Sequence, residues 1–183
     1  MKRLQALFPA LLLILSLAAC GGGQSSPTDS QDQGSNAGIP SPKAGSELVF
    51  TYKDCPLPMN AEFGPLLDYL GEPDSYFEAA SCAFDGLDKT YTYGGVEIIT
   101  YPDESKEDVD YISSVRLLDN SVSTPEGVTI GSSEAEVTAA YGEDREEYGQ
   151  QVEYENGDCV LSILFEGGKA ISVEYTAVND LLA

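Results

Sequence analysis

Hydrophobic and polar residues alternate along several short segments of the chain, which is the pattern of β-strands with one buried face. Two of the breaks between these segments are Gly94-Gly95 and Asn156-Gly157, and such pairs are typical of tight β-hairpins. The pattern predicts strands over residues 89–93, 96–101, 111–118, 152–155, 158–165 and 169–177. One further strand, with a place at a sheet edge, is predicted over residues 47–52, where every second residue is apolar.

Two other segments have the features of short helices. The later one can begin with Ser132 or Ser133 as N-cap, and glutamates in its first turn suit the positive end of the helix dipole. Apolar residues follow at helical spacing, and Gly142 can take the left-handed conformation that ends a helix. The earlier segment is rougher because it contains Pro65, which suits a first helical turn and predicts a helix that begins near Phe63.

The two helical segments belong to an apparent internal repeat. Residues 57–72 align with residues 128–143 at a constant offset, and a hairpin and a further strand follow each of them in the same order. The sequence therefore predicts an α+β fold with two tandem units, over about 57–119 and 128–178, within one domain. Each unit would be a helix followed by a three-stranded antiparallel meander. The alternative is that two unrelated runs happen to align.

The chain begins with a different kind of segment. Lys2 and Arg3 are followed by an apolar run over residues 7–17, which is shorter than the roughly 20 apolar residues that span a bilayer. A positive start, a short apolar core and small residues are typical of a secretory signal peptide. The sequence Leu17-Ala18-Ala19-Cys20 resembles the lipobox of bacterial lipoproteins. That resemblance implies cleavage before Cys20 and a diacylglycerol thioether on its sulfur, whereas a plain signal peptide would make the cysteine incidental.

The residues after Cys20 change abruptly in composition. Residues 20–45 are almost wholly small and polar, which predicts a disordered tether between residues 1–19, the signal peptide, and residues 46–183, the folded domain. Removal of the signal peptide leaves seven of the nine basic side chains against all 31 acidic ones, a formal charge of −24. Such acidity excludes nucleic acid as a partner, because its phosphates require a basic surface.

The chemistry available to the domain is narrow. The chain has no histidine, which removes the commonest general base and most zinc ligands. No Asp-x-Asp-x-Asp-Gly calcium loop occurs, and the acidic run at 103–110 is interpreted as a solvated hairpin loop. Asp85 and Asp88 could in principle form a carboxylate pair of the kind used in glycoside hydrolysis, but a turn would also place them there. We therefore expect no catalytic residue, no metal site, no cofactor and no enzyme activity.

Three cysteines remain in the domain after Cys20. None lies in a Cys-x-x-Cys pair, which disfavours zinc and thioredoxin-like chemistry. Cys55 and Cys82 flank the earlier helical segment and could form a disulfide outside the cytoplasm or stay as free thiols. Cys159 lies in an apolar strand and is expected to be a core residue.

The helical segment at 128–143 resembles a motif of two related groups, the β-lactamase inhibitory proteins and the small outer-membrane assembly lipoproteins of the SmpA/OmlA type. In both, a Gly-containing opening precedes a helix packed on an antiparallel sheet, and the inhibitory proteins carry the unit twice. This sequence departs from the motif, with Ser132 where Met is frequent and Asn60 in place of the leading Gly of the first copy. With a core segment such as residues 81–89, the whole domain also resembles uncharacterised lipoproteins of Firmicutes. The resemblance implies a fold and no activity.

These observations predict an extracytoplasmic lipoprotein held on the cell membrane by the lipid on Cys20, at the surface of a Gram-positive cell. Its expected role is that of a non-catalytic protein-binding or structural module, and its protein partner is unknown. One alternative is an inhibitor of a secreted hydrolase, which rests on the resemblance. A second alternative is a lipoprotein of envelope assembly.

Overall fold

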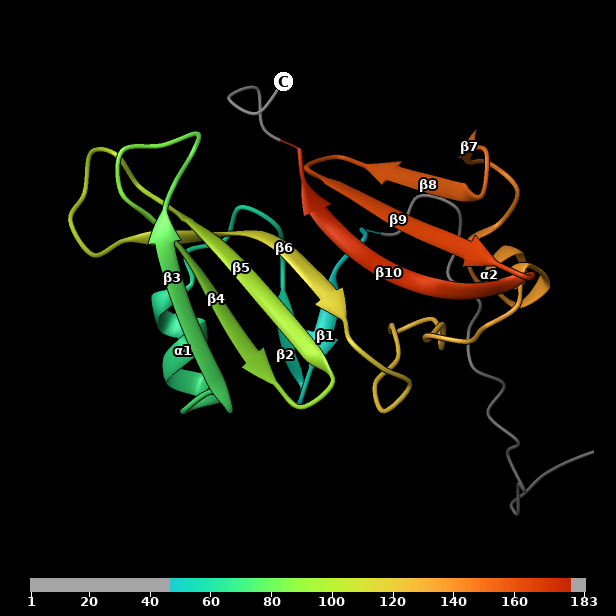
Figure 1. The fold of residues 1–183 in the computed structure, drawn as a ribbon, viewed down its shortest axis with the longest axis horizontal. Coiled ribbons are helices and arrows are strands. Elements are labelled where there is room, and N and C mark those ends of the chain that lie inside the picture. The colour runs from blue at the N-terminus through green and yellow to red at the C-terminus, as the bar shows by residue number, and fades with distance from the viewer. Residues whose placement is uncertain (1–46, 179–183) are drawn as a thin grey trace, which may run out of the picture. The chain divides into compact units, whose positions relative to one another are not determined.

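The computed structural model describes residues 47–178, which fold around one large antiparallel β-sheet (Figure 1). The predicted signal peptide, Cys20 and the tether lie outside the described residues. The sheet contains eight strands: β3 (Ser75–Ala80), β4 (Leu87–Tyr93), β5 (Val96–Pro102), β6 (Asp110–Leu117), β7 (Glu146–Tyr148), β8 (Gln151–Asn156), β9 (Cys159–Glu166) and β10 (Lys169–Ala177). Beside it lie two helices and a small second sheet: β1 (Phe50–Tyr52), β2 (Cys55–Leu57), α1 (Gly64–Leu70) and α2 (Glu134–Tyr141).

The large sheet has the strand order β3-β4-β5-β6-β10-β9-β8-β7. Strands that follow one another along the chain pair as hairpins, and the hairpin β4–β5 closes with Tyr93 opposite Val96. The exception is the centre of the sheet, where β6 pairs with β10 and Val115 lies opposite Tyr175. This long-range pairing joins the two four-stranded runs into one continuous sheet.

One face of the sheet carries the hydrophobic core. Alternate residues of the inner strands point to this face, including the fully buried Ile98, Ile112 and Ile163. The pieces outside the sheet cover it: Phe50 of β1 contacts Tyr175 with ring centroids 5.7 Å apart, and Tyr141 of α2 contacts Tyr154 at 5.2 Å. Burial of each large aliphatic side chain stabilises the fold by about 1.5–3 kcal/mol, so this face supplies most of the hydrophobic stabilisation.

The predicted fold class is wrong. The described residues do not form two units of a helix and a three-stranded meander; they form a mostly β structure, with one eight-stranded sheet, a two-stranded sheet and helices of only seven and eight residues. The prediction missed β3 and β7 because none of their side chains is buried, so neither strand has an apolar alternation. It also missed the pairing of β6 with β10, which no local pattern specifies.

The predicted strand at the start of the domain is present only in part and not in the large sheet. β1 covers three residues and pairs with β2, Phe50 opposite Leu57, in the small second sheet. Lys53 and Asp54 form the two-residue turn, with φ of 49° and 63°, as a tight hairpin of this type requires. The strand therefore packs over the core face and does not extend an edge of the large sheet.

The two helices begin in different ways. Ser133 caps α2, since its hydroxyl accepts the Glu136 N–H at 3.3 Å while the Glu136 carboxylate accepts the Ser133 N–H at 2.6 Å, which is a complete capping box. α1 begins after Phe63, as the sequence predicts, but no side chain caps it and none of its residues is buried. Phe63 itself is buried against Tyr91, with ring centroids 4.8 Å apart, and so fixes the start of α1 on the sheet.

Candidate functional site

The edge strand β3 is the longer of the two fully exposed strands of the large sheet. All six of its residues are exposed, and two of them are aromatic: Phe77 is 65% exposed and Tyr76 is 48% exposed. Tyr76 lies opposite Tyr91 on the core face of the sheet, with ring centroids 5.1 Å apart, and Phe77 therefore points to the other face. The strand thus presents one aromatic ring on each face at a free edge.

The register of β3 determines which main-chain groups face outward. Ser81 donates its N–H to the Gly86 carbonyl at 3.0 Å, just beyond the end of the β3–β4 ladder. Because hydrogen-bonded pairs alternate along an antiparallel ladder, the main-chain groups of Ala79 and Phe77 face β4. The N–H and C=O groups of the intervening residues, Tyr76, Glu78 and Ala80, consequently point to the free edge of the sheet.

The opposite edge, β7, is built differently. It has three residues, two of which are glutamates. The Arg145 guanidinium just before the strand forms an ion pair with Glu147, with the nitrogen and oxygen 2.9 Å apart. The hydrogen bond from Tyr148 to Glu146 is not a difference, because Tyr76 donates to Glu78 in β3 in the same way. Short and charged edge strands discourage pairing with another chain. β3 has twice the length and one charged residue, Glu78, so its edge lacks this protection.

Exposed carboxylates surround β3. Glu72 and Asp74 precede the strand, Glu78 lies within it and Asp85 follows it. Among residues 47–178 none of these four carboxylates is in an ion pair, whereas Lys89, Lys106, Arg116 and Arg145 are each paired with another acidic residue. No ion pair among residues 47–178 therefore neutralises these four carboxylates, although Lys89 on β4 lies opposite Glu78.

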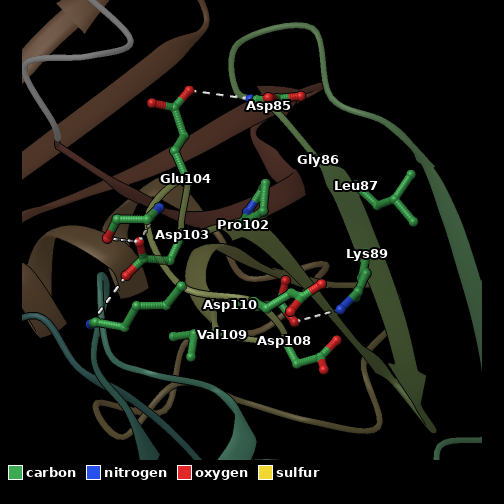
Figure 2. Close-up of a pocket in the computed structure, with 13 residues that line it drawn as sticks. Asp85, Gly86, Leu87, Lys89, Pro102, Asp103, Glu104, Asp108, Val109 and Asp110 are labelled. Atoms are coloured by element: carbon green, nitrogen blue, oxygen red, sulfur yellow. Dashed lines mark hydrogen bonds and ion pairs between the residues drawn. The ribbon is translucent and has the colours of Figure 1, made fainter.

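Beyond the far end of β3, two loops line an open acidic cavity of about 360 Å³ (Figure 2). Its lining comes from residues 85–87, 89 and 102–110. Lys89 forms an ion pair with Asp110, with the nitrogen and oxygen 2.7 Å apart, and the Asp85 N–H donates to the Glu104 carboxylate at 3.2 Å. These polar contacts join the start of β4 and the loop before it to residues 104 and 110, which the sequence pattern places on or beside a solvated hairpin loop.

A second cavity of about 360 Å³ shares the wall formed by residues 102–105 and is lined by aromatic rings. We call it the aromatic cavity. Phe84 stacks on Tyr101 with ring centroids 4.9 Å apart and an angle of 22° between the planes, and Tyr101 lies 5.7 Å from Tyr111. Tyr111 donates its hydroxyl to Asp103 at 3.0 Å. The rings and a carboxylate are therefore held together at one end of the β5–β6 hairpin.

Asp103 is the polar centre of this loop. Its carboxylate accepts the Ser105 hydroxyl at 2.7 Å and the Ser105 N–H at 2.8 Å. These two hydrogen bonds, followed by those from Lys106 and Tyr111, hold the pKa of Asp103 well below its ordinary value. Its side chain is only 13% exposed. The loop therefore keeps a charged carboxylate beside the aromatic rings at neutral pH.

The described residues place the other sequence candidates apart. Cys55, Cys82 and Cys159 are free thiols: Cys55 is buried on β2, whereas Cys82 is exposed in the loop after β3, so the structure does not join these two in a disulfide. Cys159 is a core residue, and burial raises the pKa of its thiol to about 12. Asp85 contributes to the acidic cavity, while Asp88 lies on β4.

Among residues 47–178 no group of three or more Cys, Asp or Glu side chains is arranged to hold a metal ion. Within the same residues, neither helix has the length and apolarity needed to cross a membrane. The candidate sites of this domain are therefore the free edge of β3 and the two cavities beside it.

Sequence reasoning missed both kinds of site. The edge of β3 carries no sequence signal, because a fully exposed strand shows no alternation. A signal for the aromatic cavity was present: Tyr101 and Tyr111 flank the acidic loop symmetrically, and a hairpin centred on that loop places them opposite each other, as the structure does. The sequence pattern does not separate these two tyrosines from the others, because tyrosines at alternating strand positions are mostly core residues.

Comparison with protein-family models, with curated protein sequences and with solved structures found no match to this chain. The resemblance to the inhibitory and assembly lipoproteins accordingly stays a prediction. The arguments about function that follow rest on the residues and geometry of this chain.

Proposed function

We propose that this protein is a lipid-anchored, extracytoplasmic binding protein without catalytic activity. The anchor is the diacylglycerol thioether on Cys20, supported by the charged start, the short apolar run and Leu17-Ala18-Ala19-Cys20. The composition of residues 20–45 supports a flexible tether that lets the domain sample the space outside the membrane. The absence of histidine in the sequence supports a role in binding rather than catalysis.

The proposal for binding rests on the free edge of β3. An extended segment of a partner protein would pair with the outward main-chain groups of Tyr76, Glu78 and Ala80 and add a ninth strand to the sheet. Natural sheets usually blunt their edges by short length or by charge, as β7 does here. A six-residue edge with an exposed aromatic ring on each face is the opposite arrangement, and aromatic side chains are favourable contact residues in interfaces.

The charge near β3 specifies the chemistry of the partner segment. The four exposed carboxylates around the strand, Glu72, Asp74, Glu78 and Asp85, have no ion-pair partner among residues 47–178. A basic segment would bring opposite charge to all of them, and the formal charge of −24 on the mature chain would accelerate its approach at low salt. The partner that fits this edge is therefore a protein with an extended lysine- or arginine-rich segment.

Binding can be tested on the full-length protein in detergent with two eight-residue peptides, one of alternating lysine and valine and one of alternating glutamate and valine. We expect the basic peptide to bind and the acidic peptide not to bind. The Glu78→Pro variant removes one outward N–H without breaking the pairing with β4, and proline is tolerated at such a position of an edge strand.

The matched control is Glu78→Ala, which removes the same side chain and keeps the N–H. We expect Glu78→Pro to bind the basic peptide about tenfold more weakly than Glu78→Ala, because a main-chain hydrogen bond contributes about 1–1.5 kcal/mol. Equal binding of the two peptides, or equal binding by the two variants, would overturn the proposal. Natural partners captured from envelope and secreted fractions should show the same dependence, and a captured hydrolase that loses activity would make the protein an inhibitor.

The anchor has a separate test. Expression of the wild type and of Cys20→Ala in a bacterial host, with an alkyne-labelled fatty acid in the medium, should label the wild type alone. The wild type should sediment with membranes, and its mature mass should begin at Cys20 and include the lipid. Labelling of Cys20→Ala would contradict lipidation at this residue.

A further inference from the structure

The aromatic cavity combines two properties that together select a class of ligand. Its walls include the rings of Phe84, Tyr101 and Tyr111, and its two charged lining residues, Asp103 and Glu104, are both acidic. The faces of aromatic rings carry negative electrostatic potential and attract cations, most strongly where several rings surround the site. A nearby carboxylate adds charge to that attraction.

The chain already places one of its own ammonium groups at the border of this cavity. The Lys106 nitrogen lies 5.9 Å from the centre of the Tyr111 ring, 3.2 Å from the Asp103 carboxylate and 3.1 Å from the Tyr111 hydroxyl. These contacts show that an ammonium group is accommodated between ring and carboxylate. The Lys106 side chain is 59% exposed, so it can swing away into solvent at little cost.

The Glu104 carboxylate is available to a further cation. Glu104 uses one oxygen to accept the Asp85 N–H at 3.2 Å, and it is in no ion pair among residues 47–178. Two negative charges thus face the cavity, and Lys106 balances one of them. The cavity is not suited to a metal ion, since Mg²⁺ and Ca²⁺ prefer several oxygen ligands and the described residues form no such group.

We propose that the aromatic cavity binds an organic cation that carries an alkylammonium or quaternary ammonium group. The methyl or methylene groups of the ligand would lie against Phe84 and Tyr101, and its positive charge would lie near Glu104 and Asp103. Lys106, which lines the adjoining acidic cavity, competes with the ligand for the Asp103 carboxylate. This site uses loop residues beside β3 and does not depend on strand addition at β3.

The ligand group could come from a free amine or from a methylated lysine of a protein. Nuclear magnetic resonance titration of the full-length protein in detergent, at constant ionic strength, distinguishes these sources. The probes are choline, acetyl-trimethyllysine methylamide and 3,3-dimethyl-1-butanol, which has the shape of choline without its charge. The resonances of the Tyr101 and Tyr111 rings report occupation of the cavity.

We expect at least one of the two charged probes to shift these ring resonances and to bind at least about tenfold more tightly than the neutral alcohol. The charged probe that binds more tightly identifies the source of the ammonium group. Binding of the alcohol as tightly as the charged probes would overturn the proposal. Each charged probe is added to at least 50-fold molar excess and up to about 100 mM, which covers the weak affinity expected of an exposed cation–π contact. If the ring resonances stay unchanged with both probes over this range, the proposal is also overturned.

Two surface variants complete the test. Lys106→Met removes the competing ammonium and keeps a side chain of similar length, so we expect affinity for the charged probe to rise about threefold or more. Phe84→Leu removes one ring from the wall, and we expect affinity to fall about threefold to fivefold, the equivalent of one cation–π contact. Retained affinity in Phe84→Leu, or weaker binding in Lys106→Met, would contradict the assigned site.

Discussion

The two ends of the large sheet differ in how they meet solvent. At the β7 end, the edge strand is short and charged, and the helix beside it, α2, has a complete capping box and a buried Val137. At the β3 end, the edge strand is longer, aromatic and unprotected, and α1 has no capping side chain and no buried residue. Departures from local sequence rules tend to occur at functional positions. The difference therefore supports the proposal that β3 is the end used for binding.

The two ends of the sheet also share one feature, the way in which each helix ends. The glycine after each helix has a positive φ, 78° at Gly71 and 92° at Gly142. A buried tyrosine donates its hydroxyl to the carbonyl of each glycine, Tyr93 at 2.9 Å and Tyr154 at 3.1 Å. Because these contacts hold both helix ends on the sheet, the contrast between the ends is confined to the helix starts and the edge strands.

The largest expected difference concerns how each helix is attached. Phe63→Ala should lower the free energy of unfolding by about 3–5 kcal/mol, since α1 has no buried residue of its own and depends on this ring. Val137→Ala in α2 should cost about 2 kcal/mol, for two buried methyl groups and the cavity they leave. Chemical denaturation of both variants measures the difference. An equal cost would contradict the view that α1 is anchored by the residue before it.

The capping box gives a smaller effect at the other end. Ser133→Ala should lower the free energy of unfolding by about 1 kcal/mol, because it leaves the Glu136 N–H without its acceptor. Ser123→Ala, at an exposed loop position, is the control and should change stability by less than about 0.5 kcal/mol. The account of α2 fails if the two substitutions have the same effect.

A third comparison concerns the fifth residue of a central strand in each half. In β9 this residue is Ile163, whereas in β5 it is Thr100, and both are fully buried. Among residues 47–178, the Thr100 hydroxyl is a buried group without a hydrogen-bond partner. Thr100→Val should therefore raise the free energy of unfolding by up to about 1 kcal/mol. The control is Thr124→Val, which should lower the free energy of unfolding by a similar amount, because the buried Thr124 hydroxyl accepts the Val128 N–H. A change of the same sign in the free energy of unfolding of both variants would contradict this prediction.

The pH dependence of stability should have a contribution from each end. Hydrogen bonds from the main-chain N–H and the hydroxyl of Ser133 lower the pKa of Glu136, and those from Ser105 lower the pKa of Asp103. A carboxylate with a lowered pKa stabilises the fold above its unfolded value, about 4, and this stabilisation is lost as the pH falls through the folded value. Glu136→Gln and Asp103→Asn should each flatten the loss of stability between pH 5 and pH 3, measured by denaturation at each pH. A slope as steep as that of the wild type in both would contradict the assigned hydrogen bonds.

Elements that are specified by neighbouring residues could be predicted from the sequence, whereas elements that depend on pairing between distant strands could not. α2 could be predicted because Ser133, Glu136 and Gly142 act within a few residues of one another. The inner hairpins could be predicted because burial of one face imposes alternation. β3 could not, since its six side chains are exposed and its position depends on pairing with β4. The joining of the two halves could not either, because Val115 and Tyr175 are sixty residues apart and many apolar pairs would satisfy the same pattern.

The most direct test of the binding edge is amide hydrogen exchange along β3, with and without the alternating lysine–valine peptide. In the free protein, the outward N–H groups of Tyr76, Glu78 and Ala80 should exchange fast, while those of Phe77 and Ala79 are protected by β4. We predict that the peptide slows exchange at the three outward positions and leaves β7 unchanged. Unchanged exchange at Tyr76, Glu78 and Ala80 in the presence of bound peptide, or protection at β7 instead, would contradict strand addition at β3.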